Sequence, residues 1–312
     1  MIRVLCVLPC NGKHKDLLSK AGEGKCEFVF KAPGALRDAD LSGVTAVIGN
    51  VPPEVLKGSD VRFLQLNSAG YEAYRKEDLP SGIAVCNARG AYGLTVSEHM
   101  LALTFSLIRH LERYRDRQSA HIWKDCGKVT SIYGATVLVL GLGDIGGEYA
   151  RKAKALGAGC VIGVRRSAKG DKPDFLDEQY AISDLDTLLP RADIIAMVLP
   201  GGKETEGLIN KKRIGLMKPG AYIVNCGRGS SIVQEDLYEA LESGRIAGAA
   251  IDVCDPEPLP ASSPLWDLEN LIITPHVAGN FFLQETFERV MSIACDNLQR
   301  FILGQKLFNQ VI

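Results

Sequence analysis

The sequence lacks the features of membrane, secreted and nucleic-acid-binding proteins. Its 36 Lys and Arg residues are balanced by 37 Asp and Glu residues, so no excess charge would attract a nucleic acid or a membrane surface. No apolar run approaches the roughly 20 residues that span a bilayer, and the apolar part of residues 1–8 is too short for a signal peptide. We therefore expect a soluble protein with no nucleic-acid partner and no membrane attachment.

Cysteine is present but lacks the spacing of a metal site or a disulfide framework. The nine cysteines include no CxxC pair, and several lie in apolar, strand-like segments. This pattern is typical of reduced thiols in a cytoplasmic protein. We predict no metal site.

Internal repeats and low-complexity tracts are also missing, and strand and helix signals alternate along a chain long enough for two domains. The first third of the chain predicts strands at 3–8, 27–30, 46–48, 63–66 and 84–86. A second set is predicted at 137–140, 160–164, 194–198, 222–225, 248–251 and 271–273. Helices between strands predict parallel sheets, and six strands suit a dinucleotide-binding fold.

The order of these segments predicts how the domains are connected. A long helical pattern starts at Thr95, with Glu98 completing a capping box, and leads out of the first domain. A final helix at 282–303 is too isolated to form a domain, so the chain is expected to return to the first one. We predict an α/β protein with two doubly wound parallel-sheet domains and a cleft between them. The dinucleotide-binding domain is 98–278, inserted into a discontinuous substrate domain of 1–97 and 279–312.

The sequence GLGDIG at 141–146 lies between an apolar strand-like segment and a helical one. In such a unit the first glycine permits a tight turn, the second lets the backbone approach a pyrophosphate, and the third allows close packing of helix on strand. The phosphates would lie at the positive end of the helix. The motif therefore predicts a dinucleotide site that includes Gly141, Gly143, Asp144, Ile145 and Gly146.

The end of the next predicted strand indicates which dinucleotide binds. An NAD-dependent enzyme usually has a carboxylate there for the adenosine ribose, whereas this chain has Arg165, Arg166 and Ser167. Two guanidiniums and a hydroxyl match a ribose 2′-phosphate, which a carboxylate would repel. A solvated basic turn is the alternative interpretation, but the position after a strand favours NADP(H) over NAD(H).

Three further segments each begin beyond the carboxyl end of a predicted strand, where doubly wound sheets bind ligands. They are NCGRG at 225–229, DVCDPEPLP at 252–260 and TPH at 274–276. We therefore expect an arginine, a carboxylate and a histidine to converge on one edge of the sheet.

These segments together resemble the D-2-hydroxyacid dehydrogenase family, also called the D-isomer-specific 2-hydroxyacid dehydrogenases. The resemblance covers nearly the whole chain and includes GLGDIG, LP at 199–200, NCGRGS at 225–230, AGAAIDVCDPEPLP at 247–260 and TPHVAG at 274–279. It implies a Rossmann domain inserted into a flavodoxin-like substrate domain. In character the chain is similar to NADP-dependent glyoxylate and hydroxypyruvate reductases.

The resemblance implies catalytic roles for three residues, and elementary chemistry agrees with them. Arg228 would hold the substrate carboxylate and polarise its carbonyl, because a guanidinium keeps its charge. His276 would give a proton to the alkoxide that forms as hydride arrives, since imidazole titrates near neutrality. Glu257 would orient that imidazole and keep it protonated. Taken singly, His276 is more typical of a loop hydrogen-bonder and Glu257 of a solvated turn residue, but the combination favours catalysis.

Other positions are implied to contact the cofactor or the substrate. Asp252 would bind the nicotinamide carboxamide, with a turn cap as the alternative interpretation. Pro200 and Cys226 lie in matching segments and are predicted cofactor contacts. Ala69 and Gly70 lie in a loop that looks like the one whose backbone amides receive the substrate carboxylate.

Several residues carry no functional signal of their own. Glu98 is explained by the capping box, and His99, His110 and His121 are interpreted as surface or helix-packing residues. Trp123 resembles a tryptophan that in glyoxylate and hydroxypyruvate reductases reaches a neighbouring subunit's site. Ordinary core or interface packing is the alternative interpretation of Trp123.

We therefore expect an NADP(H)-dependent reductase of a small 2-oxo acid, such as glyoxylate or hydroxypyruvate, that works as a cytoplasmic homodimer. One alternative is an NAD-linked dehydrogenase of a larger D-2-hydroxy acid. Another is a dinucleotide-sensing binding protein similar to the family's transcriptional corepressors, which the balanced charge disfavours.

Overall fold

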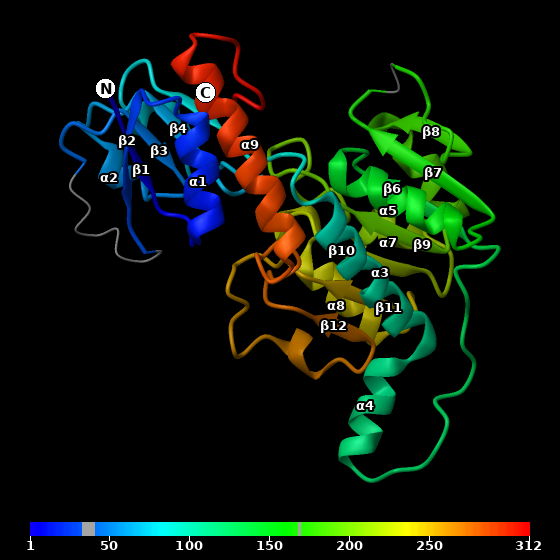
Figure 1. Cartoon of the computed structure of the whole chain (residues 1–312). Coiled ribbons are helices and arrows are strands. Elements are labelled where there is room, and N and C mark those ends of the chain that lie inside the picture. Colours follow the sequence, from blue (N-terminus) through cyan, green and yellow to red (C-terminus); the bar gives the residue numbers. More distant parts are fainter. Residues whose placement is uncertain (33–40, 168–169) are drawn as a thin grey trace. The chain divides into compact units, whose positions relative to one another are not determined.

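The computed structural model describes residues 1–32, 41–167 and 170–312. The chain forms two compact units, Met1–Tyr92 together with Phe281–Ile312, and Gly93–Asn280 (Figure 1). The first unit is therefore built from both ends of the chain. Within the described ranges, no helix has the length and apolar character needed to cross a bilayer.

The first unit contains a five-stranded parallel sheet in the order β2-β1-β3-β4-β5. This is the strand order of flavodoxin-like folds. Its central strands are short apolar runs that are buried on both faces, as parallel sheets covered by helices require. The strands are β1 (Ile2–Cys6), β2 (Cys26–Phe30), β3 (Ala46–Ile48), β4 (Phe63–Gln65) and β5 (Ala84–Cys86), and the helices are α1 (Gly12–Ala21), α2 (Pro53–Leu56), the 3₁₀ turn Lys76–Asp78 and α9 (Gln284–Ile302).

The C-terminal helix α9 packs beside α1 in this unit (Figure 1). His14 Nε2 of α1 lies 3.4 Å from Glu288 Oε1 of α9. Further along α9, Asn297 Nδ2 donates a hydrogen bond of 2.7 Å to Gln65 Oε1 at the end of β4. These contacts hold the returning end of the chain to the sheet formed by its beginning.

The second unit contains a seven-stranded parallel sheet in the order β12-β11-β10-β9-β6-β7-β8. From β6 the chain runs outward to β8, returns to β9 and then runs outward the other way, which is the Rossmann strand order with one strand added. The strands are β6 (Thr136–Leu140), β7 (Cys160–Arg165), β8 (Glu178–Ala181), β9 (Ile194–Met197), β10 (Tyr222–Asn225), β11 (Gly248–Ile251) and β12 (Leu271–Ile273). The two-domain α/β prediction is confirmed.

Six α-helices and four 3₁₀ turns accompany this sheet in the described ranges. Leucine, isoleucine and valine side chains from the sheet and from α6 to α8 form its main core, which includes Leu138, Ile195 and Ile223. The helices are α3 (Gly93–Arg109), α4 (Leu111–Ser119), α5 (Asp144–Ala155), α6 (Leu185–Leu188), α7 (Lys211–Leu216) and α8 (Gln234–Glu242), and the 3₁₀ turns are Ile182–Asp184, Leu189–Arg191, Gly229–Ser231 and Pro264–Asp267.

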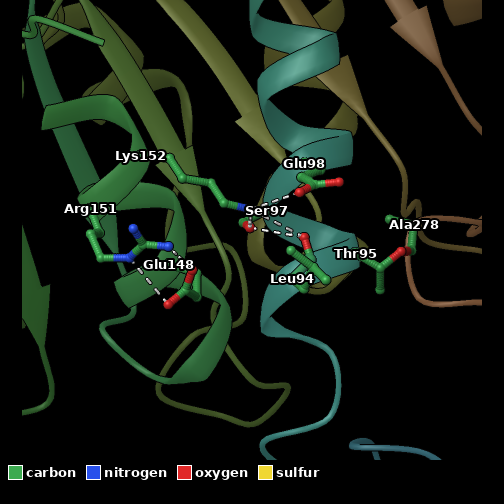
Figure 2. A network of polar contacts seen from close by, with 8 residues as sticks. All are labelled: Leu94, Thr95, Ser97, Glu98, Glu148, Arg151, Lys152 and Ala278. Atoms are coloured by element: carbon green, nitrogen blue, oxygen red, sulfur yellow. Dashed lines mark hydrogen bonds and ion pairs between the residues drawn. The ribbon is translucent and has the colours of Figure 1, made fainter. Parts of the chain in front are cut away.

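Helix α3 begins at Gly93, so the capping box predicted for Thr95 and Glu98 is wrong. Both residues lie inside the helix and bond to other elements. Thr95 Oγ1 donates to the carbonyl oxygen of Ala278, 3.2 Å away, and Glu98 Oε1 lies 3.3 Å from Lys152 Nζ of α5 (Figure 2). The first turns of α3 are thus anchored to α5 and to the segment that follows β12.

Two elements were missed because their sequence signals are weak. Strand β8 lies at the sheet edge, and none of its residues is fully buried, so it lacks both an apolar run and a clear alternation. The predicted long helix is instead two helices. His110, with a φ of 58°, separates them in the left-handed region, and α4 follows from Leu111.

Candidate active site

The glycine turn between β6 and α5 has the predicted geometry. Gly141 has a φ of 100°, which residues with a β-carbon rarely adopt. A β-carbon at Gly146 would overlap the carbonyl oxygen of Gly141, so turn and helix can pack only with glycine there. A β-carbon at Gly143 would meet no atom within 4 Å. The backbone is therefore open to a ligand at the second glycine.

This turn lies where the strand order of the sheet reverses, between β6 and β9, which is the usual ligand position in open α/β sheets. Asp144 is the first residue of α5, and Ile145 is half-buried. Asp144 packs so tightly against Gly93 that a β-carbon at Gly93 would lie 2.5 Å from Asp144 Oδ1. An open backbone at a helix N-terminus fits the pyrophosphate of a dinucleotide.

The basic residues after β7 lie next to this turn. Arg165 Nη2 donates to the carbonyl oxygen of Leu142 at 3.4 Å, which fixes its side chain beside the glycines. Arg166 Nε lies 3.2 Å from Glu204 Oε2, and both of these side chains are largely exposed, as is Ser167. Two guanidiniums and a hydroxyl therefore follow β7, and a carboxylate from another loop contacts one of them.

The loops after β9, β10 and β11 pack against one another through two glycines. A β-carbon at Gly227 would lie 2.7 Å from the backbone nitrogen of Leu199. A β-carbon at Gly229 would overlap the backbone of Cys254. The sequence Gly-Arg-Gly is therefore required for these three loops to meet, and the arginine between the glycines is held where they meet.

Arg228 is positioned by its own loop. Its carbonyl oxygen accepts hydrogen bonds from Asn225 Nδ2 at 3.0 Å and from Ser231 Oγ at 2.7 Å. Its Nη1 donates to the carbonyl oxygen of Gly227 at 2.8 Å. The half-buried guanidinium is therefore fixed in direction at the carboxyl end of β10, where it can bind a planar anion such as a carboxylate. Cys226, the neighbouring residue, is buried, and burial raises the pKa of its thiol.

Asp252, which directly follows β11, is almost completely buried and organises the loop that carries His276. Its carboxylate accepts hydrogen bonds from Thr274 Oγ1 at 2.6 Å and from the backbone nitrogens of Val277 and Ala278 at 3.0 and 3.1 Å. Its carbonyl oxygen accepts from the backbone nitrogen of His276 at 2.8 Å. Since its carboxylate oxygens already have these protein donors, Asp252 has a structural part in the site in addition to any contact with a cofactor.

His276 and Glu257 form a close pair. His276 Nδ1 lies 2.6 Å from Glu257 Oε1, and both side chains are 40% or more exposed. This contact orients the imidazole and leaves Nε2 as the nitrogen that can exchange a proton with a substrate. His276 has a φ of 51°, in the left-handed region, so its backbone conformation depends on the surrounding hydrogen bonds.

His99, which lies in no functional motif, reaches this region from α3. His99 Nε2 lies 3.1 Å from Thr274 Oγ1 and 3.6 Å from Asp252 Oδ1. Because Thr274 donates to Asp252, its hydroxyl oxygen remains available to accept from His99. No motif signals this contact, because it joins residues far apart in the chain. The only signal in the sequence is that residue 99 is a histidine, a residue type that often takes part in catalysis.

The residues predicted for substrate contact in the first unit lie in a tightly bonded loop after β4. Asn50 and Asn67 exchange two hydrogen bonds between backbone nitrogens and side-chain oxygens, at 2.6 and 2.9 Å. Asn87 Nδ2 donates to the carbonyl oxygen of Ala69 at 2.7 Å. In the described part of this unit, the backbone nitrogens of Ala69 and Gly70 have no protein acceptor. This loop can therefore receive an anion through its backbone.

In the second unit, the predicted site residues share one sheet edge. Arg228 follows β10, Asp252 follows β11 and His276 follows β12, and these parallel strands are direct neighbours. Pro200 lies in the exposed loop after β9, where its carbonyl oxygen accepts a hydrogen bond of 2.8 Å from Thr205 Oγ1. The second unit thus offers, along one edge, an open glycine turn, a fixed guanidinium and an imidazole paired with a carboxylate.

Comparison with known proteins shows the family to which the chain belongs. The family described as "D-isomer specific 2-hydroxyacid dehydrogenase, NAD binding domain" matches residues 101–278. The chain belongs to the D-isomer specific 2-hydroxyacid dehydrogenase family. It is 31% identical to a hydroxypyruvate reductase of Blautia hydrogenotrophica over 93% of this chain and 86% of that protein.

Two solved structures of family members align with the whole chain. A D-isomer specific 2-hydroxyacid dehydrogenase family protein of Aeromonas salmonicida has a TM-score of 0.87 and 31% identity, covering 100% of this chain and 99% of that one. An NADPH-dependent glyoxylate/hydroxypyruvate reductase of Sinorhizobium meliloti, in complex with NADP and sulfate, has a TM-score of 0.83 and 26% identity, covering 100% and 98%. This D-isomer specific 2-hydroxyacid dehydrogenase is thus an oxidoreductase that acts on CH–OH donors with NAD(P).

Proposed function

We propose that the enzyme uses NADPH to reduce a small 2-oxo acid, such as glyoxylate or hydroxypyruvate, to the D-2-hydroxy acid. The observation that carries this proposal is the contact of 2.6 Å between His276 Nδ1 and Glu257 Oε1, on the same sheet edge as Arg228. The names of the Blautia and Sinorhizobium relatives support the choice of a small oxo acid.

Each catalytic residue has a distinct task in this reaction. When bound, the nicotinamide cofactor supplies the hydride. Arg228 binds the carboxylate of the substrate and draws electron density toward its carbonyl oxygen. His276 gives its Nε2 proton to the alkoxide oxygen, and Glu257 stabilises the imidazolium and fixes the ring during that transfer. In the oxidative direction, neutral His276 accepts the same proton.

The cofactor would bind along the glycine turn of the second unit. We propose that Gly141, Gly143, Asp144, Ile145 and Gly146 form the pyrophosphate site, with Pro200, Cys226 and Asp252 as further contacts. The open space at Gly143 and the N-terminus of α5 fit this part of the molecule. We further propose that 98–278 is the dinucleotide-binding domain, and that 1–97 with 279–312 is the substrate domain, where Ala69 and Gly70 receive the substrate carboxylate.

The preference for NADP(H) rests on the residues after β7. Arg165, Arg166 and Ser167 would bind the ribose 2′-phosphate, and the NADP complex of the Sinorhizobium relative supports this choice. The alternative is NAD(H) with a larger D-2-hydroxy acid. Glu204 opposes phosphate binding because its carboxylate lies 3.2 Å from Arg166.

The cofactor preference is tested with variants of Arg165 and Glu204. Replacing Arg165→Gln is expected to raise KM for NADPH about tenfold or more, since charge-assisted bonds to phosphate are worth roughly 1.5–3 kcal/mol. KM for NADH should change far less. Glu204→Gln is expected to lower KM for NADPH, and Arg151→Gln on the exposed face of α5 serves as the control. Equal effects of Arg165→Gln on both cofactors would contradict the phosphate role.

The activity is tested by following NADPH and NADH consumption with glyoxylate, hydroxypyruvate, pyruvate and phenylpyruvate. We expect the highest kcat/KM for the two smallest acids with NADPH. His276→Ala should lower kcat about 10³-fold, within the range for general acid catalysis, while NADPH still binds. If the wild-type protein binds NADPH but turns over none of these acids, the function is instead that of a dinucleotide-sensing binding protein.

We also propose that the enzyme is a cytoplasmic homodimer. The nine cysteines are all unpaired, which is typical of a reducing compartment. In the segment after α3, no residue of α4 is buried, and Trp123 is fully exposed. A second copy of the chain is the proposed partner of this segment, with Trp123 reaching the partner's site.

A further inference from the structure

Two cysteine thiols touch at the end of the first strand. Cys6 is the last residue of β1 and is buried, whereas Cys10 is partly exposed and directly precedes Asn11, the N-cap of α1. Their sulfur atoms lie 3.7 Å apart, and Cys10 Sγ also lies 3.9 Å from Met291 Sδ of α9. Neither thiol has a part in the proposed reduction of oxo acids.

The two thiols differ in how readily they ionise. The hydrogen bond from Cys6 lowers the pKa of the Cys10 thiol, and the positive charge of Lys15 acts in the same direction. The same hydrogen bond raises the pKa of Cys6, and burial raises it further. Cys10 is therefore the thiol of the two that ionises more readily, and it is also the one that solvent reaches.

We propose that Cys6 and Cys10 form a peroxide-sensitive dithiol in which Cys10 is oxidised first and Cys6 then closes a disulfide with it. The Cys10 thiolate attacks one oxygen of hydrogen peroxide, breaks the O–O bond, releases hydroxide and becomes a sulfenic acid. Cys6 Sγ then attacks Cys10 Sγ and expels the sulfenic oxygen, which leaves as water with the Cys6 proton. In total, two thiols lose two electrons and two protons, and one peroxide becomes two waters.

The second step follows from the contact between the sulfur atoms. Once Cys10 is a sulfenic acid, it no longer carries the charge that opposes ionisation of Cys6. The attacking sulfur already lies 3.7 Å from its target, and residues 7–10, which join the two cysteines, form the turn that would move as the sulfur atoms reach bonding distance. Cys295 is the other cysteine whose charge acts on this pair, and burial raises the pKa of its thiol to about 11. Cys295 therefore competes with Cys6 as the residue that could form a disulfide with Cys10.

The turn that would move is packed against the loop proposed to bind substrate. Gly49, with a φ of 109°, is so close to Val7 that a β-carbon there would lie 2.5 Å from Val7 Cγ2. The next residue, Asn50, exchanges hydrogen bonds with Asn67 and donates from Nδ2 to Ser68 Oγ at 3.1 Å. Closing the disulfide should therefore disturb that loop. This consequence, unlike the disulfide itself, rests on the proposed function.

The test treats the reduced, full-length wild-type protein with a small excess of hydrogen peroxide and maps the products by mass spectrometry. The expected product is a disulfide joining Cys6 to Cys10, with the mass of two hydrogen atoms lost and then restored by dithiothreitol. Cys6→Ser should leave a sulfenic acid on Cys10 that a dimedone probe traps. Cys10→Ser should abolish both products, whereas Cys295→Ser and Cys26→Ser should leave the disulfide unchanged.

Two results would contradict the proposal that Cys6 and Cys10 form a peroxide-sensitive dithiol. One is a wild-type chain in which Cys6 and Cys10 stay reduced while another cysteine is oxidised. The other is a disulfide from Cys10 to Cys295. The effect of the disulfide on the substrate loop is tested separately. After peroxide treatment, KM for the oxo acid should rise in the wild type but not in Cys10→Ser. An unchanged KM would contradict the effect of the disulfide on the loop. An enzyme without oxo-acid turnover would contradict the proposed function. In either case, mass spectrometry alone decides whether the disulfide forms.

Discussion

His276 combines an unusual backbone conformation with a short contact to a carboxylate. Its φ of 51° is maintained by bonds from its backbone nitrogen to the carbonyl oxygens of Asp252 and Thr274, at 2.8 and 3.0 Å. The ring is then held by Glu257, 2.6 Å away. A residue in this backbone region persists only when its surroundings determine its conformation. The position of the imidazole therefore depends on Asp252 and Glu257 together.

Replacing Glu257→Gln tests the acidic member of this pair. The amide can still contact His276 Nδ1, but it cannot stabilise an imidazolium by charge, so we expect kcat to fall about 10²-fold. The measurement is steady-state reduction of glyoxylate, alongside thermal unfolding. Glu269→Gln, at an exposed carboxylate after the last 3₁₀ turn, is the control. Unchanged kcat in Glu257→Gln would remove Glu257 from the mechanism.

His99 is expected to be a positioning residue that acts through Thr274 and Asp252. Replacing His99→Leu removes one hydrogen bond of about 1 kcal/mol, so kcat should fall roughly threefold to tenfold with KM for NADPH little changed. His99→Gln keeps a donor near Thr274 Oγ1 and should restore most of the rate. If the two variants lose equal activity, His99 only packs α3.

At the scale of elements, the loops after the parallel strands are held together by backbone contacts that glycine alone permits. Replacing Gly229→Ala would force a β-carbon into the backbone of Cys254 and separate the loops after β10 and β11. We expect a loss of about 3 kcal/mol in the free energy of unfolding, at the upper end of overpacking costs, and a lower kcat because Arg228 shifts.

The matched control for this change is Gly215→Ala. Gly215 lies inside α7, and a β-carbon there would meet no atom within 4 Å. Alanine should therefore stabilise the helix by roughly 0.5–1 kcal/mol. Urea unfolding of both variants decides the matter, and equal stability of the two would show that the close approach of Gly229 to Cys254 is unimportant.

The sequence predicted those elements whose signals are local. Apolar runs placed β10, β11 and β12 with their observed bounds, and the glycine spacing placed the turn before α5. Strand β8 was not predictable because it pairs with β7 at the sheet edge through its backbone and has no fully buried residue, so its sequence carries no apolar run. The start of α3 was misplaced because its first turns are fixed by tertiary contacts, such as that of Glu98 with Lys152.

The candidate site shows the same division. Arg228, Asp252 and His276 were predictable because each follows a strand within a distinctive motif. The contact of His99 with Thr274 was not predictable, because the two residues lie on separate elements. The contact of Cys6 with Cys10 was not predictable either, because two cysteines four residues apart across a strand end do not form a CxxC motif.

At the scale of the whole molecule, the segment from α4 onward exposes several large apolar side chains to solvent. Trp123 is fully exposed, Tyr133 is 80% exposed, and Leu111 and Ile122 are each 53% exposed. Tyr114, Arg117 and His121 line a hollow of about 930 Å³ together with Trp123. Apolar and aromatic side chains gathered around a concave surface are typical of a protein–protein interface, where tryptophan and arginine contribute most of the affinity.

Replacing Trp123→Ala is therefore expected to weaken the proposed homodimer. Loss of a central tryptophan usually costs about 2 kcal/mol or more, which corresponds to an increase of about 30-fold in the dimer Kd. Sedimentation velocity across a dilution series measures this shift. Trp266→Phe is the control, because Trp266 is also half exposed but bonds through Nε1 to the carbonyl oxygen of Pro260 within its own loop. A dimer that both variants leave unchanged would place the interface elsewhere, and a wild-type protein that sediments as a monomer at all concentrations would contradict the homodimer itself.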